Sequence, residues 1–300
     1  MSFQKDVLRT TGVLAVTTTF LLQTVVGTLF NVILFFDNIT PILLGHRKRP
    51  TQIILTHMAV ANLLFLLSTG ITHIKAGFIL RNPLSSVGCK FVYYIHRVAR
   101  SSTLCCTCVL STHQSFTLIP GRVAWMMPRG RSPKVIGPSC SICWMFSFLM
   151  NCYIPMIIYG AQDVGNDTDF QEKLFCSLNS SERIAILWSI SDVMFIGLMG
   201  WASGSMALFL HRHHQRVQHI HTSNGNHKCP PETRATHTIL MLVVTFIFTY
   251  IMNSGFVFYM TIFFDTHLWL MQISNILALS FPTFSPLVLI LRHHRALSFC

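Results

Sequence analysis

The chain has 300 residues, of which 51% are hydrophobic and 11% are charged, and its formal net charge is +12. So few charged side chains cannot cover the surface of a soluble globular domain, so the composition excludes that class and makes a lipid bilayer the expected solvent. The positive charge could indicate a nucleic-acid partner, but its distribution along the chain instead predicts a membrane orientation.

Long apolar stretches follow one another through the whole chain. A helix needs roughly 20 apolar residues to cross the hydrocarbon core. Stretches of this kind predict seven spans, at about 14–36, 53–74, 91–116, 135–158, 184–210, 239–264 and 267–291. They lack the alternating pattern of membrane β-strands. We therefore predict an all-α membrane protein, a seven-transmembrane helix bundle that forms a single domain over residues 1–300, with the first span acting as a signal anchor.

Basic residues gather in the loops on one side of the predicted bundle. They lie at 47–49, 122–134, 212–234 and 292–295, whereas the opposite loops mix acidic and basic residues. Loops rich in Lys and Arg stay in the cytoplasm. The N-terminus is therefore predicted to lie outside the cell and the C-terminus in the cytoplasm.

Glycosylation motifs agree with this orientation. Asn166 and Asn179 begin Asn-x-Ser/Thr motifs in the loop between the fourth and fifth spans, which the charges place outside. Glycans are added only on that side of the membrane, so both asparagines are predicted glycosylation sites. Asn38 begins a third motif, which falls on the cytoplasmic side and is expected to stay unmodified.

Two of the ten cysteines lie where a disulfide can form. Cys89 is at the outer start of the third span and Cys176 is in the long outer loop, so both are in the oxidising compartment. We predict a disulfide between them that holds this loop over the bundle. The cysteines within spans are interpreted as small buried apolar residues; they are Cys105, Cys106, Cys108, Cys140, Cys143 and Cys152.

Charged residues inside the predicted spans are candidates for function, because a charge in the bilayer is costly. Arg97 and Arg100 lie three residues apart on one face of the third span, with Tyr93 one turn before Arg97, and Asp192 lies in the fifth span. One interpretation is a buried Arg–Asp pair that only joins helices. The other is that this face lines a cavity and offers a cation to anionic or hydrogen-bonding ligands such as steroid conjugates.

Apolar residues should form most of such a cavity. Phe256 and Tyr259 in the sixth span are candidates, together with Met260, Trp188 and Met194. For each of these residues, lipid contact or helix packing is the commoner explanation.

Several short strings resemble one receptor family. They are Gly88-Cys89-Lys90, His96-Arg97-Val98-Ala99-Arg100, Tyr153-Ile154-Pro155, Gly197-Leu198-Met199, Trp201-Ala202-Ser203, residues 215–221, residues 231–236 and Phe281-Pro282-Thr283. With the predicted spans and outer disulfide, the chain resembles a vomeronasal type 1 receptor, a family of G-protein-coupled receptors. The resemblance implies a plasma-membrane receptor for a pheromone or other small chemosensory ligand, which signals through an inhibitory-class heterotrimeric G protein.

The cytoplasmic face departs from better-known receptors of this class. Gln114 stands where rhodopsin-like receptors keep the Arg of an Asp-Arg-Tyr motif, and Asn62 stands where they place a sodium-binding Asp. Basic residues on this face either bind anionic lipid headgroups or receive the G protein. The candidates for G-protein contact are His113, Gln114, Arg212, Arg216 and Arg234.

Two other functions compete with this interpretation. A bitter-taste-like receptor shares the small size and short termini. A membrane di-iron enzyme would explain the many cytoplasmic histidines, but fixed ligand spacing and carboxylates are missing. No catalytic motif is present. We therefore expect a receptor rather than an enzyme, with no cofactor, metal or nucleic acid, whose partners are a small ligand, a heterotrimeric G protein and the bilayer.

Overall fold

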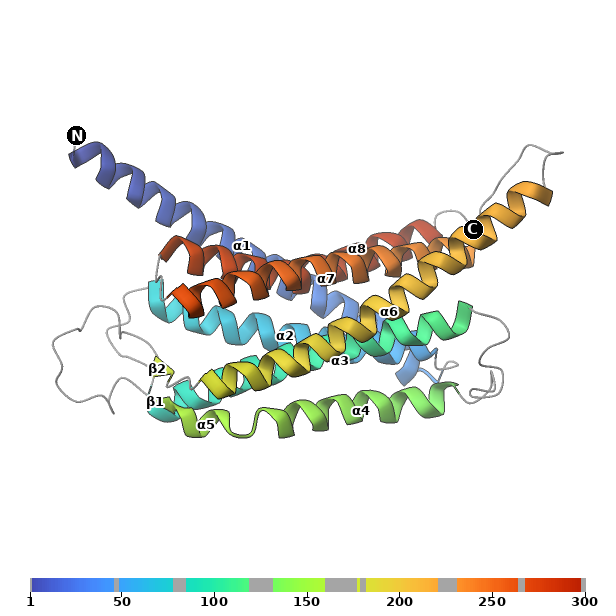
Figure 1. The fold of residues 1–300 in the computed structure, drawn as a ribbon, viewed down its shortest axis with the longest axis horizontal. Helices are drawn as coiled ribbons and strands as arrows, with labels where there is room; N and C mark the ends of the chain where they lie inside the picture. Colours follow the sequence, from blue (N-terminus) through green and yellow to red (C-terminus); the bar gives the residue numbers. More distant parts are fainter. Residues whose placement is uncertain are drawn as a thin grey trace.

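The computed structural model describes residues 2–45, 49–77, 85–118, 132–159, 177–178, 182–220, 231–263 and 268–297. Seven long helices form an elongated bundle (Figure 1). They are α1 (Ser2–Leu43), α2 (Pro50–Gly77), α3 (Ser86–Leu118), α4 (Ser132–Met150), α6 (Glu182–Ile220), α7 (Pro231–Phe263) and α8 (Leu268–Leu297). The short helix α5 (Ile154–Ile157) and the strands β1 (Ile158–Tyr159) and β2 (Ser177–Leu178) complete the described elements. The predicted all-α bundle of seven helices is confirmed, with this small β-pair added.

Five segments among the described residues are long and apolar enough to cross a membrane. They are Leu14–Leu43, Pro50–Ile71, Gly137–Ile157, Asp192–Phe209 and Gln272–Leu291, and α7 contains a shorter apolar segment, Val243–Phe256. Helix α3 is not among them, although a span was predicted there. It packs against α2, α4, α6 and α7. A helix surrounded by protein in this way can carry polar and charged residues that lipid would not tolerate.

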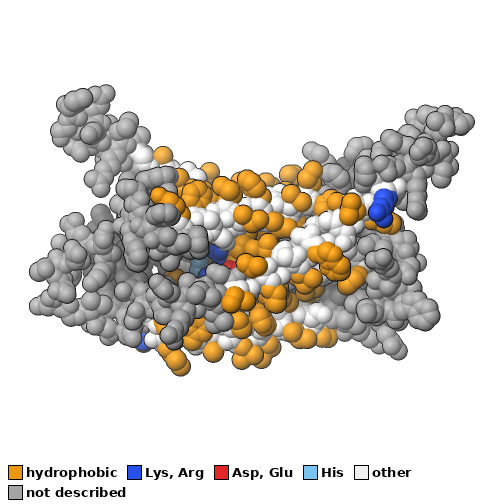
Figure 2. Space-filling model, viewed as in Figure 1, with side chains coloured by type: hydrophobic (Ala, Val, Ile, Leu, Met, Phe, Trp, Pro, Cys, Tyr) orange, Lys and Arg blue, Asp and Glu red, His pale blue; other side chains and the backbone are white. Residues whose placement is uncertain are grey.

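The outer surface of the bundle is apolar. Large hydrophobic side chains such as Leu29, Ile142, Trp201 and Phe248 are well exposed. Figure 2 shows hydrophobic side chains over the middle of the visible face, between the two ends of the bundle. This pattern is the reverse of a soluble protein and fits a surface solvated by lipid tails.

The predicted fourth span, 135–158, agrees with the apolar segment Gly137–Ile157, but its helix is interrupted within that segment. Helix α4 ends at Met150 and α5 starts at Ile154. Pro155 has no N–H, so it cannot donate to the Asn151 carbonyl as a helix interior requires. The N–H of Ile154 donates to that carbonyl instead, at 3.1 Å. Beyond α5 the chain turns into β1, which pairs antiparallel with β2.

A buried amide network joins four helices. Asn62 of α2 is fully buried, and its Nδ2 donates to Asn31 Oδ1 of α1 at 3.1 Å and to Ser285 Oγ of α8 at 3.4 Å. Its Oδ1 accepts from Thr103 Oγ1 of α3 at 3.1 Å. These bonds fix the positions of α1, α2, α3 and α8 around the centre of the bundle.

The same network compensates for a proline in α8. Pro286 cannot donate to the carbonyl of Pro282, four residues earlier in the helix. Asn31 Nδ2 donates to that carbonyl at 2.8 Å. Helix α8 therefore continues through its two prolines, because a side chain from α1 supplies the missing donor.

The two ends of the bundle carry different parts of the chain. The beginning of α1 and the β1–β2 pair lie at one end, and the C-terminal end of α8 lies at the other (Figure 1). The end with β1 and β2 is called the β-pair end below.

Candidate functional site

Arg100 lies in the middle of the bundle and contacts α7. Its guanidinium carbon is 4.8 Å from the centre of the Tyr250 ring, a cation–π contact. With the Asn253 amide oriented so that its oxygen faces Arg100, that oxygen accepts from Nη1 at 3.1 Å and from Nη2 at 3.2 Å. Arg100 therefore joins α3 to α7 through two neighbouring residues on one face of α7.

Three further hydrogen bonds extend this cluster to α6 and α8. The Tyr250 hydroxyl donates to Asp192 Oδ2 of α6. Asn253 Nδ2 in the same orientation lies 2.7 Å from Ser274 Oγ and 3.0 Å from the Ser274 carbonyl of α8. Arg100 and Asp192 are therefore linked through Tyr250. The simple Arg–Asp pair that the sequence suggested as one interpretation is replaced, for Arg100, by this three-residue arrangement.

A cavity lies beside this cluster. Its polar lining comes from Arg100, Thr103, Thr249, Tyr250 and Asn253, and its apolar lining comes from Phe65, Phe246, Leu277, Ala278, Phe281 and Pro282. The volume of this cavity is about 40 Å³. That is about three times the roughly 10–15 Å³ needed for one water, so the cavity as described holds a few water-sized groups. Mostly apolar walls with a few polar groups at one place are typical of ligand sites.

Charged side chains can be seen from one long side of the bundle. Figure 2 shows Lys or Arg and Asp or Glu side chains in a hollow of this face, with hydrophobic side chains on the side towards the middle of the bundle. Asp192 of α6 is only partly buried, in agreement with such an opening.

The other predicted ligand residues lie around this cavity rather than in its lining. Arg97 is within electrostatic range of Asp192 and Tyr93. Tyr93 packs near the β-pair end with Cys89 and Ile154. Phe256 of α7 is half-buried, and Tyr259 is 43% exposed. Of the predicted set, Arg100 alone is among the described residues that line the cavity.

The sequence analysis missed Tyr250 and Asn253 as site residues. They are three residues apart in the sixth predicted span, the same spacing as Arg97 and Arg100 in the third. Polar residues at that spacing share one helical face. The spacing was visible in the sequence, but these two residues were not selected because they are uncharged.

His96 is a further residue whose place near the cavity was not predicted. Its ring lies 4.6 Å from the ring of Phe65, centre to centre, and its Nδ1 is 3.1 Å from Thr69 Oγ1. The Thr69 hydroxyl already donates to the Phe65 carbonyl at 2.7 Å. The His96 Nδ1–H is therefore best placed to donate to Thr69, which holds the imidazole against the cavity-lining Phe65.

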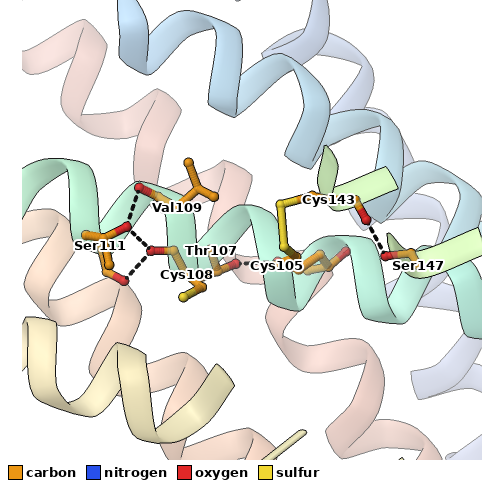
Figure 3. Close-up of a disulfide and its surroundings, with 9 residues drawn as sticks. Cys105, Thr107, Cys108, Val109, Ser111, Cys143 and Ser147 are labelled. Atoms are coloured by element: carbon orange, nitrogen blue, oxygen red, sulfur yellow. Dashed lines mark hydrogen bonds between the residues drawn. A yellow bond between two sulfur atoms is a disulfide. The ribbon is translucent and has the colours of Figure 1, made fainter. Parts of the chain in front are cut away.

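The cysteines follow the predictions only in part. Cys89 is disulfide-bonded, and Cys176 lies outside the described residues, so their pairing stays a prediction. Cys105 of α3 and Cys143 of α4 form a disulfide (Figure 3), with their Cα atoms 5.7 Å apart. Both are buried, as predicted, but the disulfide between them was not predicted. Cys152 is exposed rather than buried.

The remaining buried thiols agree with the prediction. Cys106, Cys108 and Cys140 are free and buried.

The predicted G-protein-facing residues lie towards the end of the bundle opposite the β-pair end. His113 is half-buried, Gln114 is 8% exposed and Arg212 is exposed. Arg216 and Arg234 belong to α6 and α7, but their side chains are not among those described. The predicted glycosylation sites Asn166 and Asn179 lie outside the described residues.

The described part of the chain holds no group of three or more His, Cys, Asp or Glu residues close enough to bind a metal ion.

Comparison with known proteins gives one consistent family. The model of the vomeronasal organ pheromone receptor family matches residues 14–300. Vomeronasal type-1 receptor 1 of Gorilla gorilla gorilla is 38% identical over 286 residues, which cover 94% of this chain and 81% of the gorilla protein. Vomeronasal type-1 receptor 4 of Homo sapiens is 37% identical over 283 residues, 93% of this chain and 94% of the human protein. Olfactory receptor class A-like protein 1 of Danio rerio is 31% identical over 251 residues, 81% of this chain and 78% of the fish protein.

Proposed function

Because this chain belongs to the vomeronasal type-1 receptor family, we propose that it binds a small chemosensory ligand in the cavity beside Arg100 and signals through an inhibitory-class heterotrimeric G protein. The resemblance seen in its short sequence strings is confirmed by the match over residues 14–300. The family is one of receptors rather than enzymes, and its match favours the vomeronasal over the bitter-taste alternative.

The observation that carries the ligand site is the cavity itself. It combines apolar walls from α2, α7 and α8 with the guanidinium of Arg100. Four helices meet there, so a bound molecule would contact several elements that can shift relative to one another. A ligand that fits one arrangement of these helices better than another would change their populations, which is how a receptor responds.

The proposed orientation places all seven long helices across the plasma membrane, with the N-terminus outside and the C-terminus in the cytoplasm. The positive-inside distribution of Lys and Arg supports it. The apolar outer surface and the opposite positions of α1's beginning and α8's end support the same arrangement. The cavity would then open from the outer half of the bundle or from the bilayer.

The outer loop is proposed to be held by a Cys89–Cys176 disulfide. Cys89 packs against Ile154 of α5, and the adjoining β1 pairs with β2. Ser177 of β2 directly follows Cys176 in the sequence. This path brings the chain next to Cys176 back towards the start of α3, where Cys89 lies.

The G protein is proposed to bind the opposite end, near His113, Gln114, Arg212, Arg216 and Arg234. Arg212 is exposed on α6, and the predicted cytoplasmic loops are rich in basic residues. Anionic lipid headgroups would contact the same residues in the absence of a partner.

A cell assay tests the proposal. The chain is expressed with an inhibitory-class G protein, and pools of steroids, sulfated steroids and small volatiles are applied while second messengers are recorded. We expect a response that pertussis toxin abolishes and that Arg100→Gln weakens at equal surface expression. Lys90→Gln, which also removes one positive charge from α3 but does not line the cavity, serves as the matched control. Silence of the wild-type chain at the cell surface with every pool would contradict the proposal.

A further inference from the structure

The polar groups of the cavity have already used most of their hydrogen-bond donors within the protein. The hydroxyl of Thr103 donates to Asn62 Oδ1 at 3.1 Å, and that of Thr249 donates to backbone carbonyls of its own helix at 3.0 Å. The Tyr250 hydroxyl donates to Asp192. Each hydroxyl has only one proton to give, so none of the three can also donate to a ligand without breaking an existing bond.

Arg100 is the exception. A guanidinium carries five N–H groups, and the neutral oxygens beside it, those of Asn253 and Tyr250, do not use all of them. Its Nε is buried and has no hydrogen-bond partner in the described part of the chain. The spare donors among the described side chains that line the cavity therefore belong to Arg100.

Arg100 is also a buried cation without a direct counter-ion. No described carboxylate forms a salt bridge with it, and Asp192 instead accepts the Tyr250 hydroxyl. The Tyr250 ring, the Asn253 oxygen and, at longer range, the Asp192 carboxylate offset part of the cost of burying this charge, but no negative charge contacts the guanidinium directly. A bound anion would place one in contact with it and would form charge-assisted hydrogen bonds.

The rest of the lining defines the body of the ligand. Phe65, Phe246, Leu277 and Phe281 present apolar and mostly aromatic surface. The geometry points to a compact apolar ligand with a single anionic group, a carboxylate or a sulfate ester, whose oxygens bind Arg100. This inference rests on the proposed ligand site and deepens it. A neutral alcohol would bind more weakly, and an ammonium group would be repelled by Arg100.

A head-group series tests this selectivity. The full-length chain is purified in lipid nanodiscs, and dissociation constants are measured by saturation-transfer NMR against empty nanodiscs. The ligands carry a phenyl, cyclohexyl or n-octyl group, and each of these is tested with a carboxylate, amide, alcohol or amine head group. For at least one body, we expect the carboxylate to bind about tenfold or more tightly than the alcohol, with the amine weakest.

The Arg100→Gln variant should lower carboxylate affinity about tenfold while alcohol affinity changes by less than about threefold. Lys90→Gln should leave the order of the head groups unchanged. If Arg100→Gln does not fold, Arg100→Lys replaces it; it should keep the preference for the acid but bind the acid more weakly, because a single ammonium cannot form two parallel bonds.

The inference is overturned if ligands with the four head groups bind equally, or if the amines bind most tightly. It is also overturned if no ligand shows saturable binding, or if Arg100→Gln keeps the full preference for carboxylates. These measurements need no G protein. A cell response to ligands without a charge would then leave the proposed receptor function in place, whereas acid-selective binding without any cell response would leave the inference in place and contradict the signalling.

Discussion

At the residue scale, buried amides rather than ion pairs hold the centre of the bundle together. Asn62 bonds to residues of three other helices. A neutral amide can donate and accept at once, so it satisfies hydroxyl and amide partners without a counter-ion. Asn62 stands where rhodopsin-like receptors place a sodium-binding Asp. In this structure the neutral amide instead forms hydrogen bonds with neighbouring helices.

Asn62→Ala should therefore destabilise the bundle. Interhelical hydrogen bonds in membranes contribute about 0.6 kcal/mol on average and up to about 1.7 kcal/mol. Loss of three such contacts should cost about 1–3 kcal/mol and lower the melting temperature of the purified chain. Asn38→Ala is the matched control, because the Asn38 amide bonds to the Leu34 carbonyl of its own helix. An equal fall in melting temperature for both variants would contradict this role of Asn62.

Individual site residues could be predicted only where they carry a charge. Arg100 was found from the sequence because an Arg in a membrane span is rare and costly. Tyr250 and Asn253 are uncharged, and their importance comes from facing Arg100 across the bundle. Which helix faces which depends on tertiary packing, which the pattern of a single helix does not contain.

At the element scale, the length of an apolar stretch predicted where helices lie but not where they break. Residues 135–158 are apolar enough for one span, yet the chain leaves helical geometry at residues 151–153. Pro155 indicated a kink in the sequence. At the interruption the backbone forms tighter bonds, from the Cys152 N–H to the Leu149 carbonyl at 3.3 Å and from the Ile154 N–H to the Asn151 carbonyl at 3.1 Å. The Asn151 Nδ2 also donates to Ser101 Oγ of α3 at 3.2 Å.

Close packing of α1 against α8 gives a prediction for Gly27. A Cβ at this position would lie 2.9 Å from Thr283 Oγ1 and 3.2 Å from Thr283 Cα. Small residues let membrane helices approach closely. Gly27→Val should therefore separate α1 from α8 and cost about 1–3 kcal/mol in stability, as overpacking does.

Gly200→Val in α6 is the control, since a Cβ there meets nothing within 4 Å. Both variants are measured by thermal unfolding of the purified chain in nanodiscs. A Gly27→Val protein that melts at the wild-type temperature would show that α1 and α8 are not in close contact.

At the scale of the whole molecule, the number of long helices could be predicted because polar residues separate the apolar stretches. Membrane crossing leaves few alternatives to a helix for such a stretch. The arrangement of the helices around α3, and with it the cavity, depends on contacts between stretches distant in the sequence, such as Asn31 with Pro282.

The orientation of the whole molecule gives a further prediction. An epitope tag at the N-terminus should be accessible to antibody on intact cells, and a tag at the C-terminus should need permeabilised cells. Removal of N-linked glycans should lower the apparent mass, and the combined Asn166→Gln and Asn179→Gln variant should lose this shift. Asn38→Gln is the control and should keep it. A C-terminal tag exposed on intact cells would contradict the orientation.

The location of the bound ligand tests the central claim most directly. A photoreactive diazirine derivative of an activating ligand is bound to the full-length chain, irradiated, and its attachment sites are mapped by mass spectrometry. We predict labels on Phe65 of α2 or on the cavity-lining segments 100–103 of α3, 246–253 of α7 or 277–282 of α8, and their loss when unlabelled ligand competes. Competable labelling confined to other parts of the chain would contradict the placement of the ligand beside Arg100.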